Sequence, residues 1–178
     1  MKKVEIRLTG IGGQGVVLSS VILGRAASVY DKMYAIQTQT YGSDMRGGDV
    51  CTEVIIAKEM IIYPVINNPD ILIALAQRAY DNHVKDLKPN GILITDSSLV
   101  KVDTSFKENI HYHGMFNKIA IDQFKKKTTA NMIMLGFVYK KTGVVSYHSL
   151  KKAMIDLLLS RTYELNKKAL DLGIELAE

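Results

Sequence analysis

A glycine-rich turn near the start of the chain has the residue types and spacing of a backbone anion-binding site. It runs from Gly10 to Gly15 (Gly-Ile-Gly-Gly-Gln-Gly), after a strand-like run at residues 4–9 and before a helix-like run at residues 16–29. Glycines at such a junction let backbone N–H groups converge on an anion or let another backbone pack closely, with the positive end of the helix dipole behind them. The pattern predicts a turn that either binds an anion or packs tightly.

The spacing of Gly10, Gly12 and Gly15 also matches the G-x-G-x-x-G pattern of dinucleotide-binding domains. Those domains place an Asp or Glu at the end of the second strand, where it holds ribose hydroxyls. Here the second strand-like run, residues 35–40, ends in Gln-Thr-Gln-Thr, and the first acid, Asp44, lies further along. A Walker A loop is excluded because no Lys-Ser/Thr follows the last glycine. Tight strand–helix packing, a dinucleotide site and a composite site shared with another chain remain open.

The loop at residues 41–48 is the second informative segment. It contains Arg46 followed by two glycines. Glycines allow the backbone to approach another surface closely, and the arginine fork suits a carboxylate or phosphate. In a doubly wound sheet the ends of the first and second strands lie near each other, so this loop and residues 12–15 are expected to face one crevice. The alternative is a surface turn with a solvated arginine.

Other chemically capable residues have simpler interpretations. His111 and His113 share a strand face, but without a third ligand a surface pair is favoured over a metal site. The single cysteine, Cys51, reads as a small core residue and excludes an internal disulfide or a four-cysteine cluster within this chain. Asp96 follows a strand, where it would bind a ligand or cap the next turn.

Composition narrows the class of protein. The 178 residues suffice for one domain spanning 1–178, and the net charge of +5 comes without the arginine-rich or aromatic-basic stripe of a nucleic-acid-binding protein. The N-terminus lacks a signal-peptide core, and no segment approaches the ~20 apolar residues of a membrane span. These features predict a cytoplasmic protein with neither nucleic-acid nor membrane partners.

The predicted elements alternate between strand and helix through the first half of the chain. Beyond the runs above, strands are expected at residues 50–57, 60–63, 71–75, 92–95 and 110–113. Only two residues separate 50–57 from 60–63, so we expect these two to form an antiparallel hairpin. The chain after residue 113 is predicted to be helical, with a helix after a Ser146 N-cap and a last helix at about 162–176. The fold class is therefore α/β: a three-layer α/β/α domain with a mixed, mainly parallel sheet and a helical C-terminal part.

An ordered set of segments along the chain resembles the gamma subunit of the 2-oxoacid:ferredoxin oxidoreductases. The resemblance rests on the turn at 10–15, on Gln39-Thr-Tyr-Gly42 with Arg46-Gly-Gly48, and on Ile61-Ile-Tyr-Pro64 before Asp70-Ile-Leu-Ile-Ala74. Gly91-Ile-Leu-Ile-Thr-Asp96, Asn131 with Leu135-Gly136, and residues 166–177 continue it. The segments are most similar to the 2-oxoglutarate branch; pyruvate, ketoisovalerate and indolepyruvate enzymes use related chains.

The resemblance implies a part in CoA-dependent oxidative decarboxylation of a 2-oxoacid to acyl-CoA, with ferredoxin as the electron acceptor. Thiamine diphosphate and Mg2+ are then expected between alpha and beta subunits, and iron–sulfur clusters in the beta or a ferredoxin-like delta subunit. This chain alone would hold no cofactor, contain no catalytic residue and show no activity. Isolated, it would tend to self-associate through exposed apolar docking surfaces.

The resemblance also suggests which residues touch the partner subunits or lie near CoA. The candidates are Gly12, Gly13, Gln14, Gly15, Thr40, Tyr41, Gly42, Arg46, Gly47 and Gly48. Two alternatives compete with this interpretation. One is a stand-alone Rossmann-like nucleotide-binding regulatory protein, which the missing ribose acid argues against; the other is a purely structural assembly protein.

Overall fold

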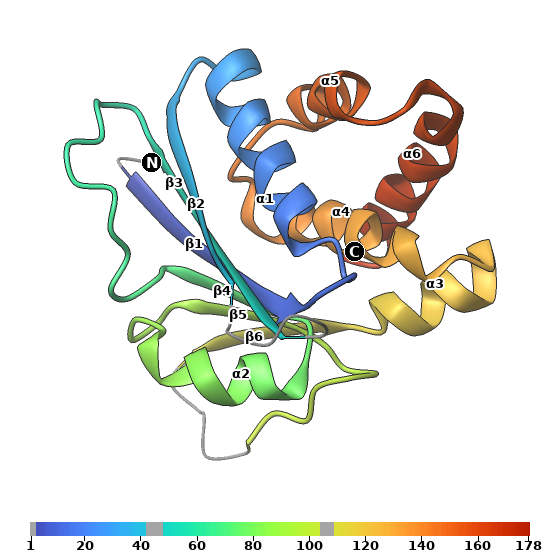
Figure 1. Ribbon diagram of the computed structural model, residues 1–178, viewed down its shortest axis with the longest axis horizontal. Helices are drawn as coiled ribbons and strands as arrows, with labels where there is room; N and C mark the ends of the chain where they lie inside the picture. Colours follow the sequence, from blue (N-terminus) through green and yellow to red (C-terminus); the bar gives the residue numbers. More distant parts are fainter. Residues whose placement is uncertain (1–2, 42–47, 104–108) are drawn as a thin grey trace.

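The strand patterns come together in one six-stranded sheet, described by a computed structural model that covers residues 3–41, 48–103 and 109–178 (Figure 1). The strands are β1 (Lys3–Ile11), β2 (Tyr34–Tyr41), β3 (Asp49–Ala57), β4 (Ile71–Ala74), β5 (Ile92–Asp96) and β6 (Ile110–Gly114). Their order is β2-β3-β1-β4-β5-β6. β1, β4, β5 and β6 are parallel neighbours, whereas β3 runs antiparallel to both β1 and β2. The prediction of a mixed, mainly parallel sheet is confirmed.

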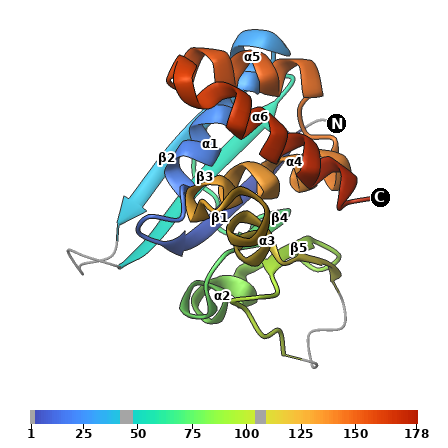
Figure 2. The same cartoon turned by 90° about the vertical axis from the view of Figure 1, so that its right-hand side faces the viewer.

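Helices cover the two faces unequally. α1 (Val16–Arg25) continues into a π-helical turn (Ala26–Tyr30), and α2 (Gln77–His83) into a 3-10 turn (Val84–Asp86). The second half supplies α3 (Phe116–Phe124), a 3-10 turn (Lys127–Thr129), α4 (Ala130–Thr142), α5 (Tyr147–Leu157) and α6 (Ser160–Glu175). α1 and α4–α6 lie on one side of the sheet and α2 on the other (Figures 1 and 2). The larger core lies on the α1 side. Among the described residues no helix is both long and apolar enough to cross a bilayer.

The predicted hairpin between residues 50–57 and 60–63 is wrong. Residues 58–70 form no strand, and Met60, Ile62 and Tyr63 are 71%, 90% and 69% exposed. β3 instead pairs along all nine of its residues with β1 and also with β2. Both edges of β3 are thereby occupied, so the apolar run at 60–63 cannot pair with β3. The antiparallel component of the sheet was expected, but its partner was misassigned.

Two glycines let α4 and α6 cross backbone to backbone. A Cβ atom on Gly136 would lie 2.0 Å from the carbonyl oxygen of Leu170, and one on Gly173 would lie 1.9 Å from that of Ile133. At such distances only the hydrogen atom of a glycine fits at these two positions. The crossing fixes α6 against α4, whose first turn lies at the candidate site.

Helix boundaries follow ordinary capping chemistry. Ser146 is the N-cap of α5, and its Oγ accepts a hydrogen bond from the Ser149 N–H at 3.1 Å. Gly143 ends α4 with φ near 60°, a left-handed conformation that glycine adopts at little cost. The Ser146 N-cap was predicted from the sequence and is confirmed.

Candidate functional site

Gln14 holds the glycine turn in place. Its Nε2 donates a hydrogen bond to the Leu75 carbonyl at 2.7 Å, and its Oε1 accepts one from the Ile11 N–H at 2.8 Å. Leu75 directly follows β4, so this one side chain ties the end of β1 to the end of the neighbouring parallel strand. The carboxyl edge of a parallel sheet is where α/β proteins bind ligands and partners. Gln14 therefore sets the shape of the turn at that edge.

The glycines of the turn serve different purposes. Gly13 has φ near 90°, and a Cβ atom there would have no neighbour within 4 Å, so this residue meets open space. Gly15 has φ near 74° and lies against Asn131, whose Nδ2 would be 2.3 Å from an added Cβ. Gly15 is also the N-cap of α1, and no described side chain caps that helix. The first N–H groups of α1 and their positive dipole end therefore lie beside an open turn.

The described ends of the second predicted segment, Tyr41 and Gly48, lie at the same end of the sheet. The Gly12 N–H donates to the Gly48 carbonyl at 3.3 Å, and Thr40 and Tyr41 pair with Cys51 and Val50 at the end of β2. Three other candidates, Gly42, Arg46 and Gly47, lie outside the described residues. The expectation of adjacent first and second strands needs correction, because β3 runs between them. Gly12 and Gly48 still meet, since β3 begins where β1 and β2 end.

A small pocket opens on the α3–α4 side of the turn. Its empty volume, open solvent included, is about 300 Å3, and its walls come from Gly13, Gln14, Leu75, Asp96, Phe116, Asn117, Lys127, Ala130 and Asn131. Asp96 is 2% exposed and accepts hydrogen bonds from Ser98 and from the Asn117 N–H at 2.8 Å. Of its two predicted roles, the structure shows the capping one. The Asn131 Oδ1 is buried without a hydrogen-bond partner.

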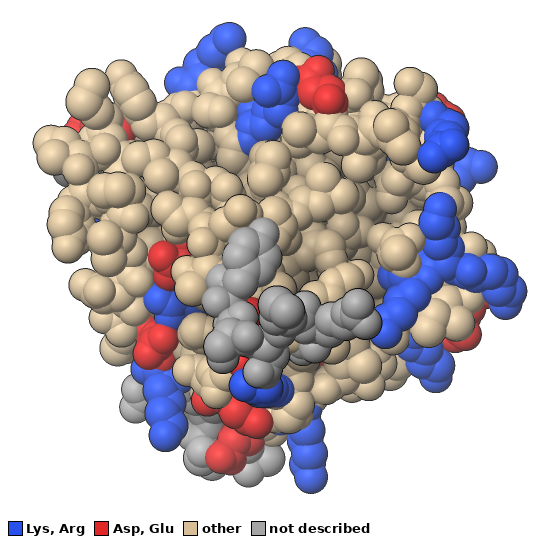
Figure 3. Space-filling model, in the orientation of Figure 1, with Lys and Arg blue, Asp and Glu red and all other residues tan. Residues whose placement is uncertain are grey.

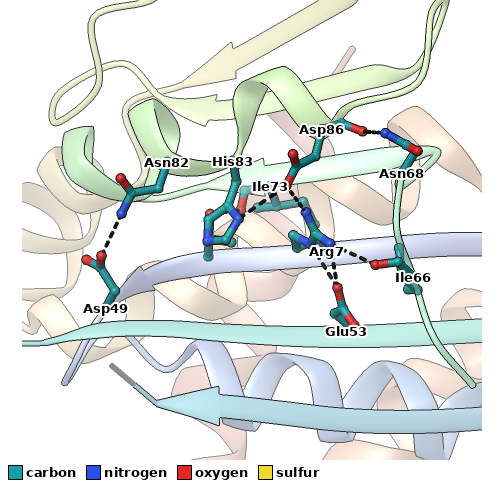
Figure 4. A network of polar contacts seen from close by, with 10 residues as sticks. Arg7, Asp49, Glu53, Ile66, Asn68, Ile73, Asn82, His83 and Asp86 are labelled. Carbon is teal, nitrogen blue, oxygen red and sulfur yellow. Dashed lines mark hydrogen bonds and ion pairs between the residues drawn. The ribbon is translucent and has the colours of Figure 1, made fainter. Parts of the chain in front are cut away.

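A buried arginine network on the other face fixes α2 to the sheet (Figure 4). The Arg7 side chain, 8% exposed, donates to Glu53 of β3 at 2.9 Å and to the Ile66 carbonyl at 2.9 Å. It also bonds Asp86 at 2.5 Å, in the turn after α2. Asp86 approaches His83 at 3.7 Å. Burial, together with the Arg7 charge, lowers the pKa of His83. The network therefore links β1, β3 and the turn after α2 on this face of the sheet.

Sequence reasoning missed this network. Its trace in the sequence is the position of Arg7 in an alternating strand: Arg7 lies between Ile6 and Leu8, which places it on the face opposite the main core. Cys51 lies on the same face, and burial raises the pKa of its thiol to about 11. Since thiolate is the reactive form, Cys51 is chemically inert near neutral pH.

The histidine pair is placed as predicted but gathers no further ligand. The rings of His111 and His113 lie 5.5 Å apart edge to face, and the His111 Nε2 is 2.9 Å from the Thr95 Oγ1. Across residues 3–41, 48–103 and 109–178, no group of three or more His, Cys, Asp or Glu side chains could hold a metal ion.

Comparisons with known proteins agree on one family. The model of the pyruvate ferredoxin/flavodoxin oxidoreductase family matches residues 5–176. The 2-oxoglutarate synthase subunit KorC of Methanocaldococcus jannaschii is 42% identical over 98% of this chain and 94% of that protein, and that of Methanothermobacter marburgensis is 40% identical over 97% and 95%. The keto/oxoacid ferredoxin oxidoreductase gamma subunit of Geobacter sulfurreducens has a similar structure, with a TM-score of 0.86, 37% identity and 98% of both chains covered.

A further solved structure shows the same fold inside a longer chain. The 2-oxoglutarate:ferredoxin oxidoreductase of Magnetococcus marinus matches 99% of this chain with a TM-score of 0.86, at 22% identity. The match covers 31% of that protein's chain. At this level of identity the likeness concerns the fold.

Proposed function

Because this chain belongs to the pyruvate ferredoxin/flavodoxin oxidoreductase family, we propose that it is the gamma subunit of a multisubunit 2-oxoglutarate:ferredoxin oxidoreductase. The complex converts 2-oxoglutarate and coenzyme A into succinyl-CoA and carbon dioxide, and two electrons pass to ferredoxin. Residues 1–178 act as one domain of that assembly. The observation that carries the proposal is the match to KorC subunits along almost the whole chain, at 38–42% identity.

The proposed division of labour assigns the redox chemistry to partner subunits. Thiamine diphosphate and Mg2+ belong between the alpha and beta subunits, and the iron–sulfur clusters to the beta or a ferredoxin-like delta subunit. A four-cysteine cluster needs more thiolates than the single Cys51 supplies. Gamma contributes surface and geometry: it completes the site and excludes water from it.

The glycine turn is proposed as the contact that performs this role. Residues 12–15 share one end of the sheet with Thr40, Tyr41 and Gly48, the Gly12 N–H bonds the Gly48 carbonyl, and Gly13 faces open space. A partner backbone can approach such a surface closely. The uncapped start of α1 favours negative charge, so the anionic end of coenzyme A is proposed to approach here, with Arg46 as its charged contact.

Reconstitution tests the proposal. The chain is combined with the alpha and beta subunits of the same organism's complex, and 2-oxoglutarate- and CoA-dependent reduction of ferredoxin is measured with and without it. Turnover only when this chain is present supports the proposal, whereas full turnover without it would leave a purely structural role. Turnover by the isolated chain, or tight binding of NAD, FAD or ATP to it, would refute the subunit assignment.

Arg46→Ala in the assembled enzyme tests the CoA contact separately. The expected result is a higher KM for coenzyme A with an unchanged KM for 2-oxoglutarate. An unchanged CoA saturation curve in a fully assembled complex removes Arg46 from the mechanism.

A further inference from the structure

An apolar groove lies next to the glycine turn, between the start of α1 and the linker from α5 to α6. Its apolar walls are Leu18 of α1 and three consecutive leucines, Leu157, Leu158 and Leu159, and its empty volume, open solvent included, is about 640 Å3. Leu159 is 62% exposed. The other lining residues are polar: Lys126, Thr128, Thr129, Asn131, Thr162 and Asn166. An apolar wall with a polar rim is the usual anatomy of a protein–protein contact.

One lysine of a basic run forms part of the groove wall. Lys126 lines the groove, its neighbours are Lys125 at the end of α3 and Lys127 at the start of the next 3-10 turn, and Lys118 lies on α3 itself. All four are exposed, and none forms an ion pair with a described residue. Figure 3 shows positive charge gathered on the right-hand side, where Figure 1 places α3. Asp122 is the only acidic residue of α3. The rim is therefore strongly positive.

The lysine run lowers the folding stability of the isolated chain. Lys125 ends α3 with φ near 52°, a left-handed conformation that glycine or asparagine adopts more easily. Three consecutive lysines also repel one another. A residue held in a strained conformation where a better one exists points to a role outside the chain's own stability.

We propose that this groove and its lysine rim bind an acidic segment of a catalytic partner subunit, with an apolar side chain of that segment inserted between Leu18 and Leu159. The proposal rests on the function proposed above and names the chemistry of the partner at this end of the molecule. Positive rim charges steer and orient an acidic partner, and the leucines supply the desolvated centre of the contact.

The geometry favours a polypeptide over a small anion or a second copy. Lys126 lines this groove and Lys127 lines the pocket at Gly13, so these two lysines do not serve one site, whereas a phosphate site needs convergent donors. A symmetric contact between two copies would place each basic rim against another basic surface. The groove also shares Leu18 with the hollow beside Gly12–Val17 and Asn131 with the pocket at Gly13. The surface therefore continues the contact proposed for the glycine turn.

Leu159→Ser separates docking from folding. Leu159 is the N-cap residue of α6, and its carbonyl accepts hydrogen bonds from both the N–H and the Oγ1 of Thr162. Serine is a better N-cap than leucine, so the melting temperature should not fall. Loss of the apolar anchor should raise the Kd for the catalytic subunits by about tenfold or more. Ile155→Ser is the matched control, because Ile155 is 59% exposed on α5 and lies outside the groove lining. The Kd of this variant for the catalytic subunits should equal that of the wild type.

A charge variant tests the rim. Lys125→Gly, Lys126→Gln and Lys127→Gln together remove three positive charges and relieve the left-handed Lys125. Binding to the catalytic subunits should weaken about tenfold and lose much of its dependence on salt, because fewer charges remain to be screened. The control is Lys151→Gln with Lys152→Gln on α5, whose ammonium groups lie over Tyr147 and Tyr30 and outside the groove.

The outcomes are distinguishable by surface-immobilised binding of purified subunits, with ferredoxin reduction measured in parallel. If the wild-type chain does not bind the catalytic subunits, the proposed function fails and this inference fails with it. If it binds but both groove variants bind equally well, only the inference is overturned. Unchanged assembly with a raised KM for coenzyme A would reassign the rim to a small anion. Lost self-association with unchanged partner binding would reassign it to a second copy. Either reassignment also overturns the inference.

Discussion

Gly173→Ala should destabilise the protein although it removes a glycine from a helix. In an open helix interior the replacement of glycine by alanine gains about 1 kcal/mol. At Gly173 the new Cβ would lie 1.9 Å from the Ile133 carbonyl oxygen, and an ordinary contact requires at least 3.4 Å. The backbones of α4 and α6 must therefore separate by about 1.5 Å, the difference between those distances. Overpacking of this kind costs about 1–3 kcal/mol or more, because a backbone cannot move aside as a side chain can.

Gly24→Ala provides the matched control. Gly24 lies in α1, and its added Cβ would be 3.8 Å from the Gln37 Cβ, an ordinary contact. This variant should gain about 0.5–1 kcal/mol. For a protein of 178 residues, about 2–4 °C of melting temperature corresponds to 1 kcal/mol. Gly24→Ala should therefore melt about 2 °C above the wild type, and Gly173→Ala several degrees below it.

The double variant Gly136→Ala with Gly173→Ala refines the test. Once one methyl group has pushed the helices apart, the second finds more room, so the combined loss should be smaller than the sum of the two single losses. Thermal denaturation followed by circular dichroism measures all four variants. The close-crossing argument fails if Gly173→Ala melts at or above the wild type.

Three further predictions concern single groups. His83 has a lowered pKa because it is buried and near Arg7, so its folded form resists protonation; stability should fall as the pH drops below the ordinary value of 6.5 and through the folded pKa. Urea unfolding between pH 5 and 8 should show a weaker pH slope for His83→Gln, and equal slopes would contradict this. Cys51, with its pKa raised to about 11, should react with iodoacetamide at pH 8 about 100-fold more slowly in the folded than in the urea-unfolded chain; similar rates would show the thiol to be accessible and unperturbed. Gln14→Leu removes both bonds that hold the glycine turn, costs about 1–3 kcal/mol, and should weaken binding to the catalytic subunits; unchanged affinity would mean that the turn is not the contact.

The sequence predicted the elements whose cause is local. Strands such as Ile71–Ala74 are apolar runs, this one preceded by the turn residues Pro69 and Asp70, and Ser146 carries its capping chemistry in its own side chain. The glycine turn after β1 was likewise predicted, because strand, glycines and helix are adjacent in the chain. Such features depend on near neighbours, which a sequence displays directly.

Features set by distant partners were not predicted. The apolar run at 60–63 resembled a strand, yet whether it joins the sheet depends on which edges β3 leaves free. The Arg7 network joins residues 46 and 79 positions apart, and the groove at Leu159 needs α1, α5 and α6 together. Gln14 was noted only as a member of the glycine-rich motif. Its hydrogen bond to Leu75 was not predicted, because Leu75 lies 61 residues away.

The position of β1 in the sheet has a consequence for folding during synthesis. β1 is made first, but its two neighbours, β3 and β4, end at Ala57 and Ala74, and none of its ladder bonds is to an adjacent segment. At about 5–20 residues per second, the nascent strand waits several seconds for them with its apolar side chains unpaired. Contacts this remote in sequence also slow the search for the native arrangement. A newly synthesised chain should therefore depend on chaperones early, before it binds its partner subunits.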